Sequence, residues 1–139
     1  MEKYNNPCRL SDFGPLPFAT DINKATLFNS NYRAVLWTGE RLQVTLMCIP
    51  AGGEIGSEIH PDTDQFLRVE SGKGMAVMGK NKDVFDYQFT LGDGYAIFVP
   101  AGIWHNVINT GACPLKLYSI YAPPHHPHGT VQKIKEQAD

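Results

Sequence analysis

Four side chains that can bind a divalent metal ion stand in two segments of the sequence. Glu58, His60 and Gln65 lie within the stretch EIGSEIHPDTDQ, and His105 lies much further along the chain in WHNVIN. Successive side chains of an extended strand point to opposite faces, so Glu58 and His60 share a face if their segment is extended. Carboxylate oxygens, amide oxygens and imidazole nitrogens all bind divalent metals. If the fold brings the two segments together, the four residues form one cluster that can hold an ion.

Short strands are the elements that must position this cluster. Gly and Pro recur at short intervals, and the runs between them are rich in β-branched and aromatic residues, which is typical of all-β sandwiches and barrels. The predicted strands are residues 32–38, 42–49, 66–70, 74–79, 84–90, 95–99, 104–109 and 115–121. Two short helices are predicted, one at 21–28 with Asp21 as its cap and one at 130–137 with Thr130 as its cap. We therefore expect an all-β fold.

Length and charge limit the architecture and the partners. A chain of 139 residues is long enough for one domain with a sizeable core. We expect an N-terminal arm at 1–30, a barrel at 31–122, and a Pro/His-rich loop with a short C-terminal helix at 123–139. The net charge is −2 and the charged residues are scattered, which argues against nucleic acid or an anionic membrane as a partner. No apolar run has the length of a membrane span, so we expect a soluble, cytoplasmic protein.

The spacings around the four candidate ligands resemble the two paired motifs of the cupin superfamily. Those motifs are G-x5-H-x-H-x3,4-E-x6-G and G-x5-P-x-G-x2-H-x3-N. This chain has Gly52-x5-Glu58-x-His60-x4-Gln65-x6-Gly72 and then Gly94-x5-Pro100-x-Gly102-x2-His105-x3-Asn109. The second motif matches at every defined position. In the first, Glu58 takes the place of a histidine and Gln65 takes the place of the glutamate.

The resemblance implies a double-stranded β-helix, or jelly-roll, barrel that holds one divalent metal ion per chain. Its ligands would be Glu58, His60, Gln65 and His105. One carboxylate and three neutral ligands leave a divalent ion with a net charge of about +1, as the usual three histidines and one glutamate do. Both replacements are oxygen donors, which favours a working site over ordinary hydrogen-bonded residues. The donor set suits Zn, Mn, Fe, Ni or Co without distinguishing among them.

Cupins catalyse many reactions, so the resemblance leaves several activities open. The ligand set is similar to that of phosphomannose isomerases, which favours an isomerase or lyase-type enzyme acting by Lewis-acid activation of a small sugar or uronate-like substrate. Glu58, His60 and His105 also match the two-histidine, one-carboxylate set of non-haem Fe(II) dioxygenases. A non-catalytic small-molecule-binding cupin is a third reading. Arg33, Arg68 and the other basic residues form no cluster in the sequence, which argues against a phosphorylated substrate.

Catalysis at such a site needs a group that moves protons. In the run LKLYSIY, Lys116 should face solvent, which places Tyr121 on the inner face near the ion. Glu58 and Tyr121 are therefore the candidate catalytic residues, although a tyrosine with an ordinary hydrogen bond at the barrel mouth is equally consistent with the pattern. The later run PPHHPHG contains three histidines that suit a second metal site, a lid, a source of the base or, slightly favoured, a surface loop; they are His125, His126 and His128.

The strands predicted at 32–38 and 42–49 also bear on assembly. They carry apolar residues in both strand phases, and a sheet that is apolar on both faces needs a cover on its outer face. Either the N-terminal arm or a second subunit can supply that cover. Because cupins often pair through such a sheet, we expect a homodimer.

Overall fold

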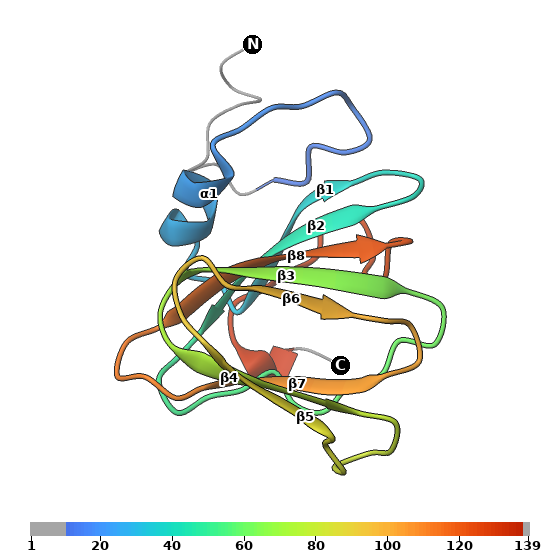
Figure 1. The fold of residues 1–139 in the computed structure, drawn as a ribbon. Coiled ribbons are helices and arrows are strands. Elements are labelled where there is room, and N and C mark those ends of the chain that lie inside the picture. Colours follow the sequence, from blue (N-terminus) through green and yellow to red (C-terminus); the bar gives the residue numbers. More distant parts are fainter. Residues whose placement is uncertain (1–10, 138–139) are drawn as a thin grey trace.

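The chain folds into two antiparallel β-sheets that face each other in the computed structural model, which describes residues 11–137 (Figure 1). The large sheet has the strand order β6-β3-β8-β2-β1-β9, and the small sheet has the order β5-β4-β7. The strands are β1 (Arg33–Thr38), β2 (Gln43–Ile49), β3 (Asp64–Ser71), β4 (Gly74–Gly79), β5 (Tyr87–Leu91), β6 (Ala96–Val99), β7 (Trp104–Asn109), β8 (Leu115–Ala122) and β9 (Val131–Gln132). The helices within the described residues are α1 (Ile22–Phe28) and the 3-10 helix η2 (Lys135–Gln137). This is the predicted jelly-roll barrel, and every predicted strand has its counterpart.

The side chains of β8 show how strand phase separates the inside of the barrel from the outside. Leu117, Ser119 and Tyr121 point inward and are at most 1% exposed. Lys116 points to the outer face, as its phase predicts, and is partly exposed there. Its ammonium group donates hydrogen bonds to two backbone carbonyls at the end of α1 and so ties the helix to the sheet.

The main apolar core lies between the two sheets. Both sheets contribute buried side chains to it, among them Met47, Ile49, Leu67, Val69, Ala76, Met78, Leu91, Ile97, Val107, Leu115 and Leu117. Each of the larger side chains (Val, Leu, Ile and Met) stabilises the fold by about 1.5–3 kcal/mol through its removal from water. The core therefore provides the rigid frame on which polar residues at the other end of the barrel can be held.

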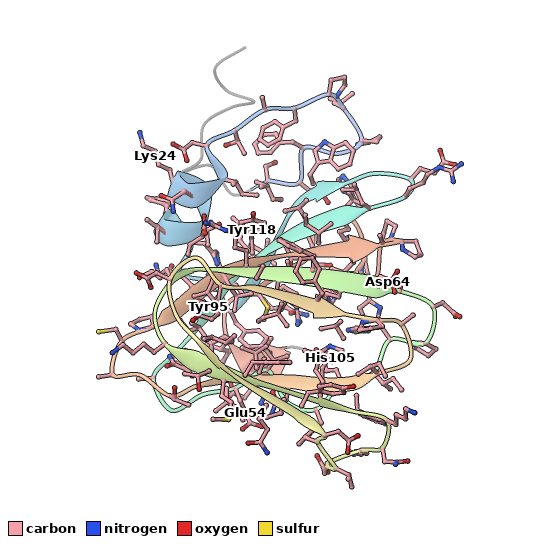
Figure 2. The ribbon with its side chains drawn as sticks, viewed as in Figure 1. Lys24, Glu54, Asp64, Tyr95, His105 and Tyr118 are labelled. Carbon is pink, nitrogen blue, oxygen red and sulfur yellow. The ribbon has the colours of Figure 1, made fainter. Side chains whose placement is uncertain are left out.

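The outer face of the large sheet is covered by the chain's own residues 11–30 (Figure 1). The rings of Phe13 and Phe18 stack with their centroids 4.5 Å apart, and together with Ala25 of α1 they belong to a second apolar cluster. Tyr118 lies on this side of the sheet, towards α1 (Figure 2). The chain itself thus supplies the cover that the two-sided strands require, and the homodimer stays a prediction.

The two predicted helices have different outcomes. α1 forms, and Asp21 caps it by accepting a hydrogen bond from the backbone N–H of Lys24 at 3.1 Å. The helix predicted at 130–137 is wrong over most of its length, because β9 pairs there with β1 and only η2 is helical. Pairing with the free edge of β1 satisfies backbone groups that a short helix would leave to water. No helix in the described part of the chain is long and apolar enough to cross a lipid bilayer.

Candidate metal centre

Backbone pairing brings the two motif segments side by side. Glu58 and His105 exchange both of their backbone N–H···O=C hydrogen bonds, each at 2.9 Å. Residues that pair in this way in an antiparallel arrangement place their side chains on the same face. The N–H of Gly102 also donates to the carbonyl of His60 at 2.9 Å, and Gly102 has a φ of 82°, a conformation that favours glycine. These contacts supply the link between segments that strand phase alone cannot establish.

Glu58, His60 and His105 form a compact cluster inside the barrel. Their potential ligand atoms all lie within 4.8 Å of one another. The two imidazole rings are 5.2 Å apart between centroids, and both histidines are buried, whereas Glu58 is half-buried. His105 projects from β7 into the space between the two sheets (Figure 2). Such a group is compatible with one metal ion.

Gln65 lies on β3, where its backbone pairs with that of Tyr121 on β8. The side-chain nitrogen of Gln65 donates a hydrogen bond of 2.8 Å to the hydroxyl of Ser119. This bond fixes the amide so that the nitrogen is occupied, while its buried oxygen Oε1 has no hydrogen-bond partner. An amide binds a metal through oxygen, so Ser119 holds Gln65 in the orientation that a ligand needs.

Unpartnered buried atoms test whether these residues fit a metal ion. Residues 11–137 contain seven buried side-chain nitrogen or oxygen atoms without a hydrogen-bond partner, and four of them are Nδ1 and Nε2 of His60, Oε1 of Gln65 and Nε2 of His105. Leaving such an atom unpaired costs about 1–3 kcal/mol, so a concentration of them needs an explanation. In His105, Nδ1 lies 3.0 Å from the carbonyl oxygen of Ile103, which leaves the lone pair of Nε2 available. The group of Glu58, His60 and His105 is therefore compatible with a divalent ion, and Oε1 of Gln65 is a further buried oxygen without a partner.

The pKa values of the two histidines favour metal binding at neutral pH. Burial, followed by the nearby His125, lowers the pKa of His60 to about 4. Burial also lowers the pKa of His105, against the opposing effect of its hydrogen bond to Ile103. Both imidazoles are consequently neutral and can offer lone pairs. Burial raises the pKa of the Glu58 carboxyl, and the positive charge of Arg33 acts in the opposite direction.

Comparisons with known proteins agree with the fold described above. The family described as the cupin domain matches residues 45–121. The chain belongs to the cupin family. It is 58% identical to the protein YrkC of Bacillus subtilis (strain 168), over 93% of this chain and 69% of YrkC. It is 39% identical to the protein L612 of Acanthamoeba polyphaga mimivirus, over 87% of this chain and 74% of L612. The crystal structure of BH2720 from Bacillus halodurans is similar with a TM-score of 0.91 and 57% identity, over 92% of this chain and 97% of that one.

Tyr121 of this cupin lies beside the cluster, as its strand phase predicts. Its ring is 5.6 Å from that of His60 between centroids, and its hydroxyl is 3.3 Å from Nε2 of His126. Burial raises the pKa of Tyr121 to about 12, so the phenol keeps its proton at neutral pH. Tyr121 is therefore available as a proton donor next to the candidate ligands.

The Pro/His-rich segment reaches the site through two of its three histidines. The ring of His125 lies 4.3 Å from that of His60, and His126 contacts the Tyr121 hydroxyl. The segment has the loop structure that the sequence slightly favoured, with His125 and His128 exposed, and it also borders the candidate site. His128 lies apart from them, with Nε2 2.9 Å from the carbonyl oxygen of Gly14.

Gln43 is a site residue that the sequence did not indicate. Its side-chain oxygen accepts hydrogen bonds from the backbone N–H groups of His125 and His126 at 3.1 and 2.9 Å. Its side-chain nitrogen donates to the carbonyl of His126 at 2.8 Å. Gln43 thereby fastens the Pro/His-rich segment to β2. No local signal marks this role, because the partners lie more than eighty residues away.

Arg33 is the second residue that sequence reasoning missed. It is 3% exposed, and its backbone pairs with that of Met47, which places both side chains on the inner face of the large sheet. The only available signal was a charged residue in the same strand phase as Val35, within an otherwise apolar run. The barrel of this cupin thus contains a buried cation as well as the candidate ligands.

Proposed function

We propose that this cupin binds one divalent metal ion through Glu58, His60, Gln65 and His105 and catalyses an isomerase or lyase-type reaction on a small sugar or uronate-like substrate. Two observations carry the proposal: the compact group of Glu58, His60 and His105, and the unpartnered ligand atoms on His60, Gln65 and His105. When bound, the ion would polarise a substrate carbonyl and make the neighbouring proton easier to remove.

The residues around the centre support proton transfer. Tyr121 carries a proton at neutral pH, and the nearby His126 is neutral because burial lowers its pKa to about 3. Tyr121 can therefore give a proton to a substrate oxygen and recover one through Nε2 of His126, which is half-buried and closer to solvent. A carboxylate that binds a metal through one oxygen keeps the other to accept a proton, which gives Glu58 its candidate catalytic role.

Metal analysis of the purified protein tests the binding part of the proposal. We expect about one metal ion per chain in the wild-type protein and almost none in the His60→Ala/His105→Ala double variant. His128→Ala is the matched control, since that histidine contacts Gly14 and lies away from the cluster. Equal metal content in the wild-type protein and the double variant would contradict the proposal.

Exchange of substrate protons with solvent tests the catalytic part. Metal-loaded protein is incubated in D₂O with a panel of aldoses, ketoses and uronates, and deuterium incorporation next to the carbonyl is followed by NMR. We expect catalysed incorporation for at least one substrate, reduced about 10²–10⁴-fold in Tyr121→Phe, which is the usual contribution of one general acid or base. Full exchange activity in Tyr121→Phe would remove this residue from the mechanism, and absence of exchange across the panel would count against an isomerase or lyase.

A second candidate is a non-haem Fe(II) dioxygenase. It is favoured by the fact that Glu58, His60 and His105 form a compact two-histidine, one-carboxylate group by themselves. Oxygen consumption by anaerobically iron-loaded protein, measured with catechols, thiols and diketones, separates the candidates. Substrate-dependent oxygen uptake without deuterium exchange would favour the dioxygenase. Binding of a small molecule with neither reaction would favour a non-catalytic cupin.

A further inference from the structure

Arg33 is a buried cation without an anionic partner in the described chain. Its Nη1 donates a hydrogen bond of 2.8 Å to the side-chain oxygen of Gln132, and its guanidinium carbon lies 5.2 Å from the centre of the Tyr32 ring. Its Nε is buried and has no hydrogen-bond partner. The ion pairs within residues 11–137 are Arg41–Glu40, Arg68–Glu70 and His128–Asp12, none of which includes Arg33. A buried charge that lacks a counterion is costly, so its retention calls for a function.

The positive charge of Arg33 acts on the side chains of the candidate metal centre. It lowers the pKa values of Glu58 and Tyr121, which burial raises more strongly. It also adds to the larger effect by which burial lowers the pKa of His60. It also acts on His126 in the same direction. These four side chains come from two segments of the chain, 58–60 and 121–126, and all of them belong to the site described above. Strand pairing gives the same placement, because Arg33 shares the inner face with Thr45, whose strand partner Ser119 holds the Gln65 amide.

A second unpartnered group lies on the same inner face. Thr45 on β2 is fully buried, its backbone pairs with that of Ser119 on β8, and its hydroxyl has no hydrogen-bond partner. Thr45 is two residues from Met47, the strand partner of Arg33, so the two side chains share a face on adjacent strands. One guanidinium N–H and one hydroxyl thus remain free inside the barrel.

The net positive charge of the site favours the binding of an anion. A divalent ion, one Glu58 carboxylate and one Arg33 guanidinium add up to a net charge of about +2 in a buried space. A guanidinium recognises a carboxylate particularly well, because its planar N–H groups match the two oxygens. A carboxylate also brings a single negative charge, which one arginine can balance.

We propose that Arg33, with the hydroxyl of Thr45 as a second donor, binds the carboxylate of a small organic acid whose neighbouring oxygen faces the metal centre. The inference rests on the proposed function and narrows its substrates to acids such as uronates and 2-hydroxy acids, with neutral sugars excluded. His125 is exposed while His60 and Tyr121 behind it are buried, so the acid enters past the segment that Gln43 holds.

Matched pairs of acid and neutral ligands test this proposal. Zn-loaded protein is titrated calorimetrically with D-galacturonate and D-galactose, and with glycolate and glycolamide. We expect each acid to bind at least about tenfold more tightly than its neutral partner, since a charge-assisted hydrogen bond is worth more than a neutral one. The preference should disappear in Arg33→Gln and persist in Gln132→Leu, which removes the hydrogen-bond partner of Arg33 but keeps its charge. Equal affinities within both pairs, or an undiminished preference in Arg33→Gln, would overturn the proposal.

Two further measurements keep this test separate from that of the metal site. Thermal unfolding of metal-free protein should be shifted upward by the acids more than by the neutral partners, because Arg33 and Thr45 do not depend on the ion. Metal content of every variant shows whether the metal site itself has failed. If Arg33→Gln does not fold, the wild-type acid preference and its weakening in Arg33→Lys decide the question. Inorganic phosphate that binds as tightly as the acids would overturn the assignment to carboxylates.

Discussion

The two ends of the barrel interior differ in what their side chains leave unsatisfied. Across β2, β8 and β3, one row consists of Met47, Leu117 and Val69, and a row nearer the mouth consists of Gln43, Tyr121 and Gln65. All six residues are at most 5% exposed. Within these three strands the apolar row needs no other partner, since its members need only contact one another. On β1 the row continues into Arg33. In the polar row, Oε1 of Gln65 has no hydrogen-bond partner. The same holds for ring nitrogens of His60 and His105 in the candidate site.

This difference shows that the two ends of the same strands have different roles. The apolar end supplies stability, and the polar end holds atoms whose bonding capacity is left for a ligand. Groups that cost stability in the free protein persist only where the surrounding structure fixes them. Here the same three strands continue from one end into the other, so the core that stabilises the fold also positions the candidate ligands.

Shortening one side chain of the apolar row is the most direct test of whether the two ends are independent. Leu117→Ala should lower the free energy of unfolding by about 2–5 kcal/mol, because it leaves a cavity in the closely packed core. Metal content per folded chain should stay at the wild-type value, since Leu117 lies two rows from Gln65. Urea unfolding followed by metal analysis measures both quantities. A loss of metal binding in folded Leu117→Ala would show that the two ends are not independent.

A change in the polar end should act on one segment. Gln43→Leu removes three hydrogen bonds to His125 and His126 and should cost about 1–3 kcal/mol, the range for buried groups that lose their partners. We expect faster hydrogen exchange and faster proteolysis in the Pro/His-rich segment, with the exchange rates of β3 and β8 unchanged. Arg41→Leu, an exposed position in the hairpin before Gln43, is the matched control. Uniform loss of protection over the whole barrel would contradict a local positioning role.

The fold was largely predictable from the sequence, and so was most of the candidate site. Strand phase placed Ser119 and Tyr121 inside the barrel, because alternation depends only on local geometry. The paired motif spacings placed Glu58, His60 and His105 at one site before any contact was known. Motif spacing of this kind indicates which residues come together in the fold. The alternation of side chains along each strand then indicates on which face they lie.

What the sequence left open depends on partners that are distant along the chain. β9 forms because β1 offers a free edge, and no propensity within residues 130–137 signals that edge. The contacts of Gln43 reach backbone groups that any sequence has. Arg33 is informative only once its lack of a counterion is known, which is a property of the assembled barrel. In each case the missing information is tertiary, which propensity does not contain.

A smaller effect should follow from the hydroxyl that orients Gln65. Ser119→Ala removes the hydrogen bond that fixes the amide, and loss of such an outer partner typically weakens metal binding about 10–100-fold. Competition titration with a chromogenic chelator measures the affinity. Thr63→Ser is a conservative control at a buried position between His60 and Gln65. Unchanged metal affinity in Ser119→Ala would mean that Gln65 does not act as a ligand through the oxygen assigned here.

The last prediction concerns the stability of the metal-free protein in acid, where the effect within any one pH unit is small. Burial lowers the pKa of His126 to about 3, so between pH 6.5 and that value the unfolded chain takes up a proton that the folded chain does not. Stability should therefore fall as the pH falls through this range, by up to about 1.4 kcal/mol per pH unit from this group. His126→Asn should have a shallower dependence than the wild-type protein, whereas Leu117→Ala should be less stable at every pH with the same slope. Urea unfolding at a series of pH values measures both slopes, and an unchanged slope in His126→Asn would contradict the buried, neutral state of this histidine. A shallower slope in His126→Asn would locate this pH dependence in the polar end of the barrel, where burial keeps His60, His105 and His126 neutral.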